Sequence, residues 1–110
     1  FTHIWDIADA HVKALQYLEA GGVTNAFNIG AGSGKSVLQV FAEYQLQVGQ
    51  GIQFSIGARR PGDIPMNYAD ISKAKAVLGW EPKSSDCKTI VKDALQWYRS
   101  TLYKELVSNP

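Results

Sequence analysis

The feature that most constrains the fold is the alternation of helical and extended patterns within a chain of 110 residues. Where apolar residues recur every three or four positions, the spacing is that of one helix face, which predicts helices over residues 6–20, 36–48, 70–78 and 86–102. Short apolar runs predict short strands over residues 1–5, 26–29, 52–56 and 66–69. We therefore expect one mixed α/β domain, residues 1–110, with about four helices and a few short strands, too few for a complete doubly wound (Rossmann) sheet.

Residues that suit helix ends flank the predicted helices. Side chains that can accept hydrogen bonds from a first helical turn are Asp6, Ser36 and Asp70. Glycines that can end a helix follow at Gly21, Gly49 and Gly79. Asp6, Ser36 and Asp70 are therefore the predicted N-caps.

Charge and cysteine content exclude several classes of protein. The net charge is +1, so no electrostatic argument favours nucleic acid or an anionic membrane. Cys87 is the only cysteine, which rules out an intrachain disulfide, and there is no Cys/His cluster for zinc. We interpret Cys87 as an ordinary residue at a helix start. His3 and His11 are expected to pack or cap, and metal ligation by them is the less favoured alternative.

The apolar runs and the start of the chain bear on the expected compartment. No apolar run approaches the roughly 18 residues needed to span a bilayer, and residues 1–6 lack the pattern of a signal peptide. The cytoplasm is therefore the expected compartment. The chain begins at Phe1 and its only methionine is Met66, so we expect a piece of a longer protein or a product whose start was removed.

The run Gly30-Ala31-Gly32-Ser33-Gly34-Lys35-Ser36 resembles a nucleoside-triphosphate phosphate loop. Such a loop needs four residues between its first glycine and Gly-Lys-Ser, but only three lie between Gly30 and Gly34. A loop one residue shorter directs different backbone amides toward the phosphate. We therefore favour a glycine-rich turn before a helix capped by Ser36, with a weak anion site at the helix start as an open alternative.

A second polar motif, Arg59-Arg60-Pro61-Gly62-Asp63, combines two guanidinium groups, a turn dipeptide and a carboxylate. Pro61 and Gly62 favour a turn, because proline fixes φ and glycine tolerates positive φ. Guanidinium suits a phosphate or diphosphate, and a carboxylate can accept hydrogen bonds from sugar hydroxyls. From these residues alone, both a solvated surface turn and a phosphate site remain possible.

Five sequence blocks in order resemble the C-terminal part of UDP-glucose 4-epimerases, in the extended short-chain dehydrogenase/reductase superfamily. The resemblance runs from Phe1 to about Arg99. The blocks are His3-Ile4-x-Asp6-Ile7-Ala8-Asp9-Ala10-His11, Phe27-Asn28-Ile29-Gly30-x-Gly32-x-Gly34-x-Ser36-Val37, Ala58-Arg59-Arg60-Pro61-Gly62-Asp63, Tyr68-Ala69-Asp70-x-Ser72-Lys73-Ala74 with Leu78-Gly79-Trp80, and the helix ending Trp97-Tyr98.

The resemblance implies roles for three residues. Such enzymes use NAD, bound by an N-terminal Rossmann domain, to oxidise and re-reduce C4 of a UDP-sugar, and their smaller C-terminal domain holds the UDP portion. Arg60 then resembles the arginine that binds the diphosphate, and Asp63 the carboxylate that holds the ribose hydroxyls. Asn67 falls where the family places a Tyr or Cys at the edge of the sugar pocket.

Departures from the family pattern limit what this chain is expected to do. It has no Gly-x-x-Gly-x-x-Gly fingerprint and no Tyr-x-x-x-Lys pair, and it begins just after the family's second UDP-binding arginine. We therefore expect no bound cofactor, no catalytic residue and no epimerisation by this chain alone, but binding of a UDP-sugar or uridine nucleotide.

Two alternatives remain open. One is a self-associating interaction or scaffold module that has lost its ligand, and the other is one half of a split epimerase completed by a separate Rossmann chain. Because apolar surface that would rest on a Rossmann domain has no partner here, we also expect a homo-oligomer.

Overall fold

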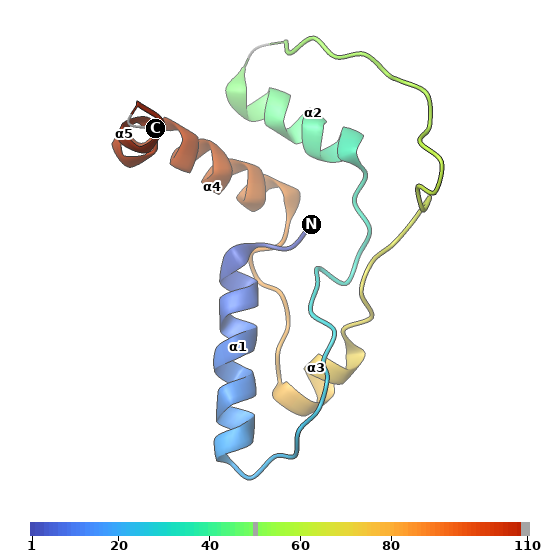
Figure 1. Cartoon of the computed structure of the whole chain (residues 1–110), viewed down its shortest axis with the longest axis vertical. Helices are drawn as coiled ribbons and strands as arrows, with labels where there is room; N and C mark the ends of the chain where they lie inside the picture. The colour runs from blue at the N-terminus through green and yellow to red at the C-terminus, as the bar shows by residue number, and fades with distance from the viewer. Residues whose placement is uncertain (50, 109–110) are drawn as a thin grey trace.

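The computed structural model describes residues 1–49 and 51–108, and these form five helices and no strand. The helices are α1 (Ile4–Glu19), α2 (Val37–Val48), α3 (Ser72–Leu78), α4 (Cys87–Arg99) and α5 (Thr101–Ser108). In Figure 1, α1 and α3 form one half of the molecule, and α2 packs on α4 in the other half.

The predicted mixed α/β fold is wrong, because the described part of the chain is helical with long extended connections. Residues 26–29, 52–56 and 66–69 are extended but form no ladder, and residues 1–3 lead directly into α1. A strand depends on hydrogen bonds to a neighbouring strand, and an apolar run cannot supply that neighbour by itself. The predicted strands are therefore not formed in the described residues.

Two helix starts differ from the prediction. Helix α1 begins at Ile4, because the Nδ1 atom of His3 accepts a hydrogen bond from the Trp5 amide at 3.1 Å and so caps the helix. Asp6 is therefore not the cap but a buried residue of the first turn. At α3 the N-cap is Ile71, although the Asp70 carboxylate still accepts from the Ser72 amide at 2.9 Å.

Other helix ends are as predicted. Ser36 caps α2 in a capping box, in which its hydroxyl accepts from the Gln39 amide and its own amide donates to the Gln39 side chain. Gly49 and Gly79 end α2 and α3 in the left-handed conformation. The last predicted helix is divided, since Ser100 is extended and separates α4 from α5.

The core is small and centres on Trp80, whose side chain is fully buried. Ala10 of α1 and Ala74 of α3 pack against it. Partly buried apolar residues surround this cluster, namely Phe27, Ile29, Ile71 and Leu78. In the other half, α4 packs on α2, and its buried residues are Val91 and Leu95.

Asp6 joins α1 to the segment between α3 and α4. Its carboxylate accepts hydrogen bonds from the Lys83 amide at 2.9 Å, the Ser84 amide at 3.0 Å and the Ser85 hydroxyl at 2.5 Å. Its carbonyl oxygen accepts from the indole N–H of Trp80 at 3.0 Å. The buried carboxylate is thus supplied with donors from residues about 80 positions away in sequence.

These contacts set the pKa of Asp6. Burial opposes ionisation, but hydrogen bonds from the Ser85 hydroxyl and from the Lys83 and Ser84 amides outweigh it. The pKa of Asp6 therefore lies below its ordinary value of 3.8.

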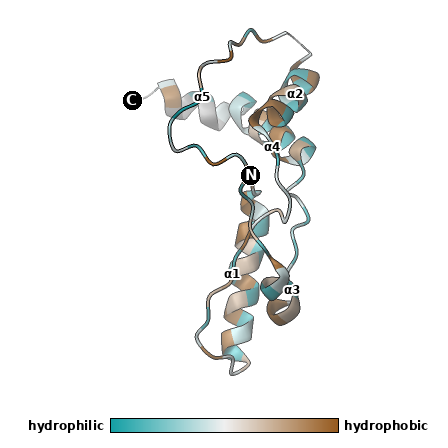
Figure 2. Cartoon of the chain, turned by 90° about the vertical axis from the view of Figure 1, so that its right-hand side faces the viewer, coloured by the Kyte–Doolittle hydropathy of each residue, from teal (hydrophilic) through white to brown (hydrophobic). Residues whose placement is uncertain are grey.

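The chain is more extended than a packed domain of its length. Its radius of gyration is 17.7 Å, whereas about 13 Å is expected for roughly 110 residues. Many large apolar side chains are exposed, and Figure 2 shows apolar stretches along α1 and α2. No helix in the described residues is long and apolar enough to cross a membrane.

We predict that Asp6 makes folding stability depend on acid pH. Because its folded pKa is lowered, its contribution is complete above the unfolded pKa of about 3.9 and is lost as the pH falls through the folded value. Asp6→Asn leaves donors unsatisfied, so we expect its free energy of unfolding near neutral pH to lie about 1–3 kcal/mol below that of the parent. On acidification, the free energy of unfolding should fall less in Asp6→Asn than in the parent. Urea unfolding followed by circular dichroism at about pH 7 and about pH 3 measures both.

Asp9→Asn is the matched control, since Asp9 lies on the same helix and makes no comparable contacts. Equal acid sensitivity in the parent and in Asp6→Asn would contradict the prediction.

Candidate functional site

The predicted turn at residues 60–63 is present. The Asp63 amide donates to the Arg60 carbonyl at 3.3 Å, and Gly62 has φ of 85°. Proline at the second position and a glycine with positive φ at the third are typical of a type II turn. The sequence therefore predicted this local geometry correctly.

The turn pairs the two residues that were expected to contact a ligand. The Arg60 Nε atom lies 3.2 Å from Asp63 Oδ2, and Arg59 donates to the Asp63 carbonyl at 2.7 Å. The side chains of Arg60 and Asp63 are 84% and 45% exposed. Because an exposed ion pair of this kind contributes only about 0–1 kcal/mol, a ligand can replace it easily.

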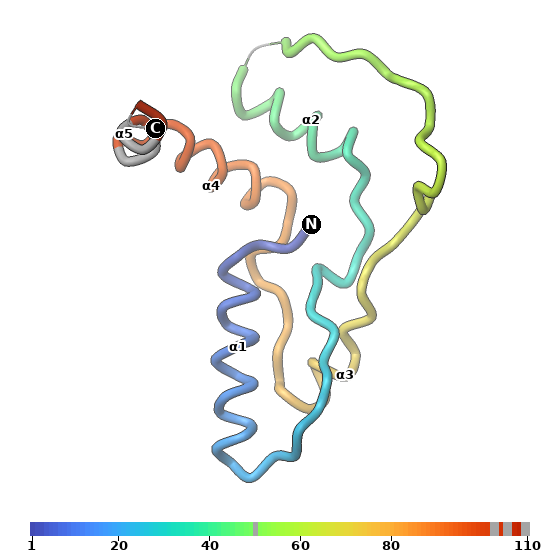
Figure 3. The backbone as a smooth tube through the Cα atoms, in the orientation of Figure 1, coloured from blue at the N-terminus to red at the C-terminus, as the bar shows by residue number. Residues whose placement is uncertain are grey.

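The turn lies on a long connection between α2 and α3, which we call the strap and define as residues 51–71 (Figure 3). Near its first end, the Gln45 side chain donates a hydrogen bond to the Ile52 carbonyl at 3.2 Å, and the ring centroids of Phe41 and Phe54 lie 4.7 Å apart. Near its second end, Ala69 packs against Gly30. Residues 55–68, between these contacts, are exposed.

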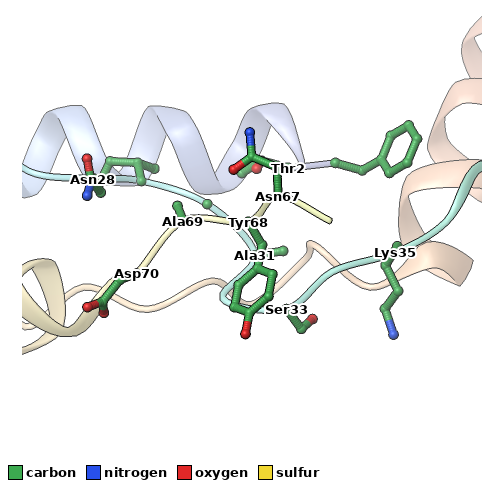
Figure 4. A pocket seen from close by; sticks show the side chains of 12 residues that line it. Thr2, Asn28, Ala31, Ser33, Lys35, Asn67, Tyr68, Ala69 and Asp70 are labelled. Carbon is green, nitrogen blue, oxygen red and sulfur yellow. The ribbon is translucent and has the colours of Figure 1, made fainter. Parts of the chain in front are cut away.

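Asn67 lines an open cleft of about 620 Å³, between the chain start, the glycine-rich turn and the end of the strap (Figure 4). The polar side chains that line this cleft are Thr2, Asn28, Ser33, Lys35, Asn67, Tyr68 and Asp70. Arg60 and Asp63 are not among its lining residues. The structure thus places Asn67 at the cleft and the other two predicted site residues farther along the strap.

Gly30 shows why the glycine-rich turn has its shape. It is buried, and a β-carbon built on it would lie 2.8 Å from the Ala69 β-carbon. Its missing side chain is therefore needed for the close approach of the strap, and the amides of Ser36 and Gln39 are used in the capping box. The structure favours the interpretation as a glycine-rich turn over a phosphate loop, although no strand precedes it.

The cleft carries one ionised carboxylate. The Ser72 hydroxyl and then the Ser72 amide donate to Asp70, at 2.5 Å and 2.9 Å, and these bonds lower the pKa of Asp70. In Figure 4, Asp70 and Lys35 lie at opposite ends of the view.

The two histidines have structural partners. His3 accepts from Trp5 at Nδ1, so its Nε2 carries the proton donated to Asp93 at 3.2 Å. The Nδ1 atom of His11 lies 2.8 Å from the Ile7 carbonyl. Among the residues that the structure describes, no three His, Cys, Asp or Glu side chains are placed to hold a metal ion.

Sequence reasoning did not assign Ser33, Lys35 or Tyr68 to a site. All three line the same cleft as Asn67. A signal existed, because Ser33 and Lys35 occupy the glycine-rich turn and Tyr68 follows Asn67 directly. It was not decisive, because the two segments lie about 30 residues apart in sequence.

Comparison with known proteins gives a consistent set of relatives, although no family model matches the chain. UDP-glucose 4-epimerase of Lacticaseibacillus casei is 39% identical over 100 residues, 91% of this chain and 30% of the relative. The enzyme of the same name from Streptococcus mutans is 40% identical over 100 residues, with the same two coverages. The chain thus spans about 30% of the length of these relatives.

Solved structures give the same result. UDP-glucose 4-epimerase from Stenotrophomonas maltophila, with NAD and formylated UDP-arabinopyranose, matches with a TM-score of 0.85 and 36% identity over 94% of this chain and 30% of that one. The Bifidobacterium longum enzyme, with NAD+ and UDP, matches with a TM-score of 0.77 and 32% identity over 92% and 30%. The chain therefore matches the C-terminal part of UDP-glucose 4-epimerases, which belong to the short-chain dehydrogenase/reductase family.

Proposed function

We propose that this chain binds the UDP portion of a nucleotide sugar, as the C-terminal part of a UDP-glucose 4-epimerase-like protein. The observation that carries the proposal is the exposed type II turn with Arg60 and Asp63 paired on it, in a chain similar to an epimerase structure with UDP bound. On this proposal, the Arg60 guanidinium binds the diphosphate and the Asp63 carboxylate accepts hydrogen bonds from the ribose hydroxyls. Asn67 borders the sugar.

Catalysis is not part of the proposal for this chain alone. The hydride chemistry of the family needs NAD and a Tyr-x-x-x-Lys pair, and this sequence has neither the NAD fingerprint nor the pair. The glycine-rich turn also lacks the Gly-x-Gly-x-x-Gly spacing of a dinucleotide-binding loop, because its glycines are Gly30, Gly32 and Gly34. We propose that a Rossmann domain, in the same protein or in a separate chain, supplies these groups. The cytoplasm remains the proposed compartment.

We predict that substitutions of Arg60 and of Asp63 change the affinities for UDP and for inorganic pyrophosphate in different ways. Arg60→Gln removes the guanidinium, so we expect binding of both ligands to weaken about five- to tenfold. Asp63→Asn releases Arg60 and removes a negative charge, so we expect pyrophosphate to bind at least as tightly and UDP to bind less tightly than to the parent. Isothermal titration calorimetry at low salt measures each affinity.

Arg99→Gln is the matched control, because Arg99 is an exposed arginine at the end of α4. Equal affinities for UDP in Arg60→Gln and Arg99→Gln, or no UDP binding by the parent at millimolar concentration, would refute the proposed role of this turn.

Asn67 leads to a prediction about which UDP-sugars a full-length homologue accepts. Asn is smaller than Tyr and more polar than Cys, and the cleft beside it is open. A full-length homologue with Asn at this position is therefore expected to turn over UDP-N-acetylgalactosamine as well as UDP-galactose. Comparison of kcat/KM for the two sugars tests this, and exclusive use of the unacetylated sugar would count against it.

A second candidate function, self-association, is favoured by the exposed apolar surface of α1. Ile4, Trp5, Leu15 and Leu18 are each more than half exposed. We expect light scattering at high micromolar concentration to give the mass of a dimer or larger species, and Leu15→Gln to lower that mass. Lys13→Gln, on the same helix, is the control. A monomeric parent would refute self-association.

A further inference from the structure

The cleft that contains Asn67 is electrically asymmetric. Among the side chains that line it, Lys35 is the only cation and Asp70 the only carboxylate. The two residues lie at opposite ends of the cleft in Figure 4, and Asp70 is held by Ser72. A ligand with a negative group and several hydroxyls would therefore be oriented, with its negative group toward Lys35.

The donors at the Lys35 end are not used within the chain. In Figure 4 the Lys35 ammonium and the hydroxyls of Ser33 and Tyr68 point to the same side. Among the described residues, none of these three side chains forms a hydrogen bond or ion pair. A cation and two hydroxyl donors on one side of the same cleft are suited to a phosphate group, for which lysine acts as a point charge.

The backbone that carries Lys35 is held in place. Gly30 packs against Ala69 before it, and the Ser36–Gln39 capping box follows it directly. Arg60, in contrast, lies within the exposed part of the strap. Lys35 thus lies where neighbouring contacts hold the backbone, whereas Arg60 lies on a segment with few contacts.

We propose that Lys35, with Ser33 and Tyr68, binds a phosphate group of the nucleotide sugar and is the second cation of the UDP site. This inference rests on the proposed function, and it names a residue that the family resemblance does not assign. Lys35 binds the phosphate at the cleft, and Arg60 approaches the diphosphate from the strap. Asn28 and Asp70, at the other end, face the hydroxyl-bearing part of the ligand.

The test uses the full 110-residue chain with UDP, uridine and inorganic pyrophosphate as ligands. We expect Lys35→Gln to weaken UDP and pyrophosphate about tenfold and to leave uridine unchanged, because only the phosphate contact is lost. We expect the difference to shrink at high salt, because the charge is exposed. Lys92→Gln on α4 removes an equal charge away from the cleft and should change none of the three affinities.

The outcomes separate this inference from the proposed function. If UDP binds and Lys35→Gln matches Lys92→Gln, the role of Lys35 is refuted while the proposed function stands. If pyrophosphate binding depends on Lys35 but UDP binds no better than pyrophosphate, Lys35 is a phosphate site and the nucleotide function is refuted. If neither ligand binds the parent, both are refuted. Circular dichroism of each variant, unchanged from the parent, shows that the substitution has not altered the helices.

Discussion

The rest of the structure depends on the buried carboxylate of Asp6. A charge with so little access to water is stable only when donors surround it. Here those donors are two consecutive amides and a hydroxyl from residues 83–85, while the carbonyl of the same residue binds the buried Trp80 indole. One residue in the first turn of α1 therefore fixes the chain between α3 and α4. Because α4 begins at Cys87, directly after this segment, Asp6 also sets the direction in which α4 leaves.

His3 extends this connection to the other half of the molecule. Its amide donates to the Ser85 hydroxyl, which in turn donates to Asp6, and its ring bonds to Asp93 of α4. Only one proton arrangement of the neutral ring allows Nδ1 to cap α1 while Nε2 donates to Asp93. The start of α1 thus holds together two halves that share little buried apolar surface, and the small core alone could not do so.

Local features of this fold could be predicted from sequence, but features made by distant residues could not. The N-cap at Ser36 and the turn at Pro61-Gly62 depend on residues within a few positions, and both were predicted. The role of Asp6 was missed, because every donor to its side chain lies more than 70 residues away. The strands failed for the same physical reason, since an extended run at residues 26–29 becomes a strand only with a partner. The cleft joins three separate segments, so the sequence alone did not indicate that Lys35 and Asn67 line the same cleft.

The separation between the cleft and the Arg60–Asp63 turn has an energetic consequence for any ligand. Residues 55–68 are exposed, so their conformation is held mainly by the two ends of the strap and by the turn itself. A ligand that engages Arg60 must restrict this segment, and the conformational entropy lost subtracts from the affinity that its contacts provide. The part of the cleft that Ser33 and Lys35 line needs less ordering, because the Gly30–Ala69 contact and the Ser36–Gln39 capping box hold its backbone. A ligand that reaches both places would gain most of its affinity in the cleft. The Arg60–Asp63 turn would contribute mainly discrimination, because only a molecule with the correct spacing of phosphate and hydroxyl groups can satisfy both.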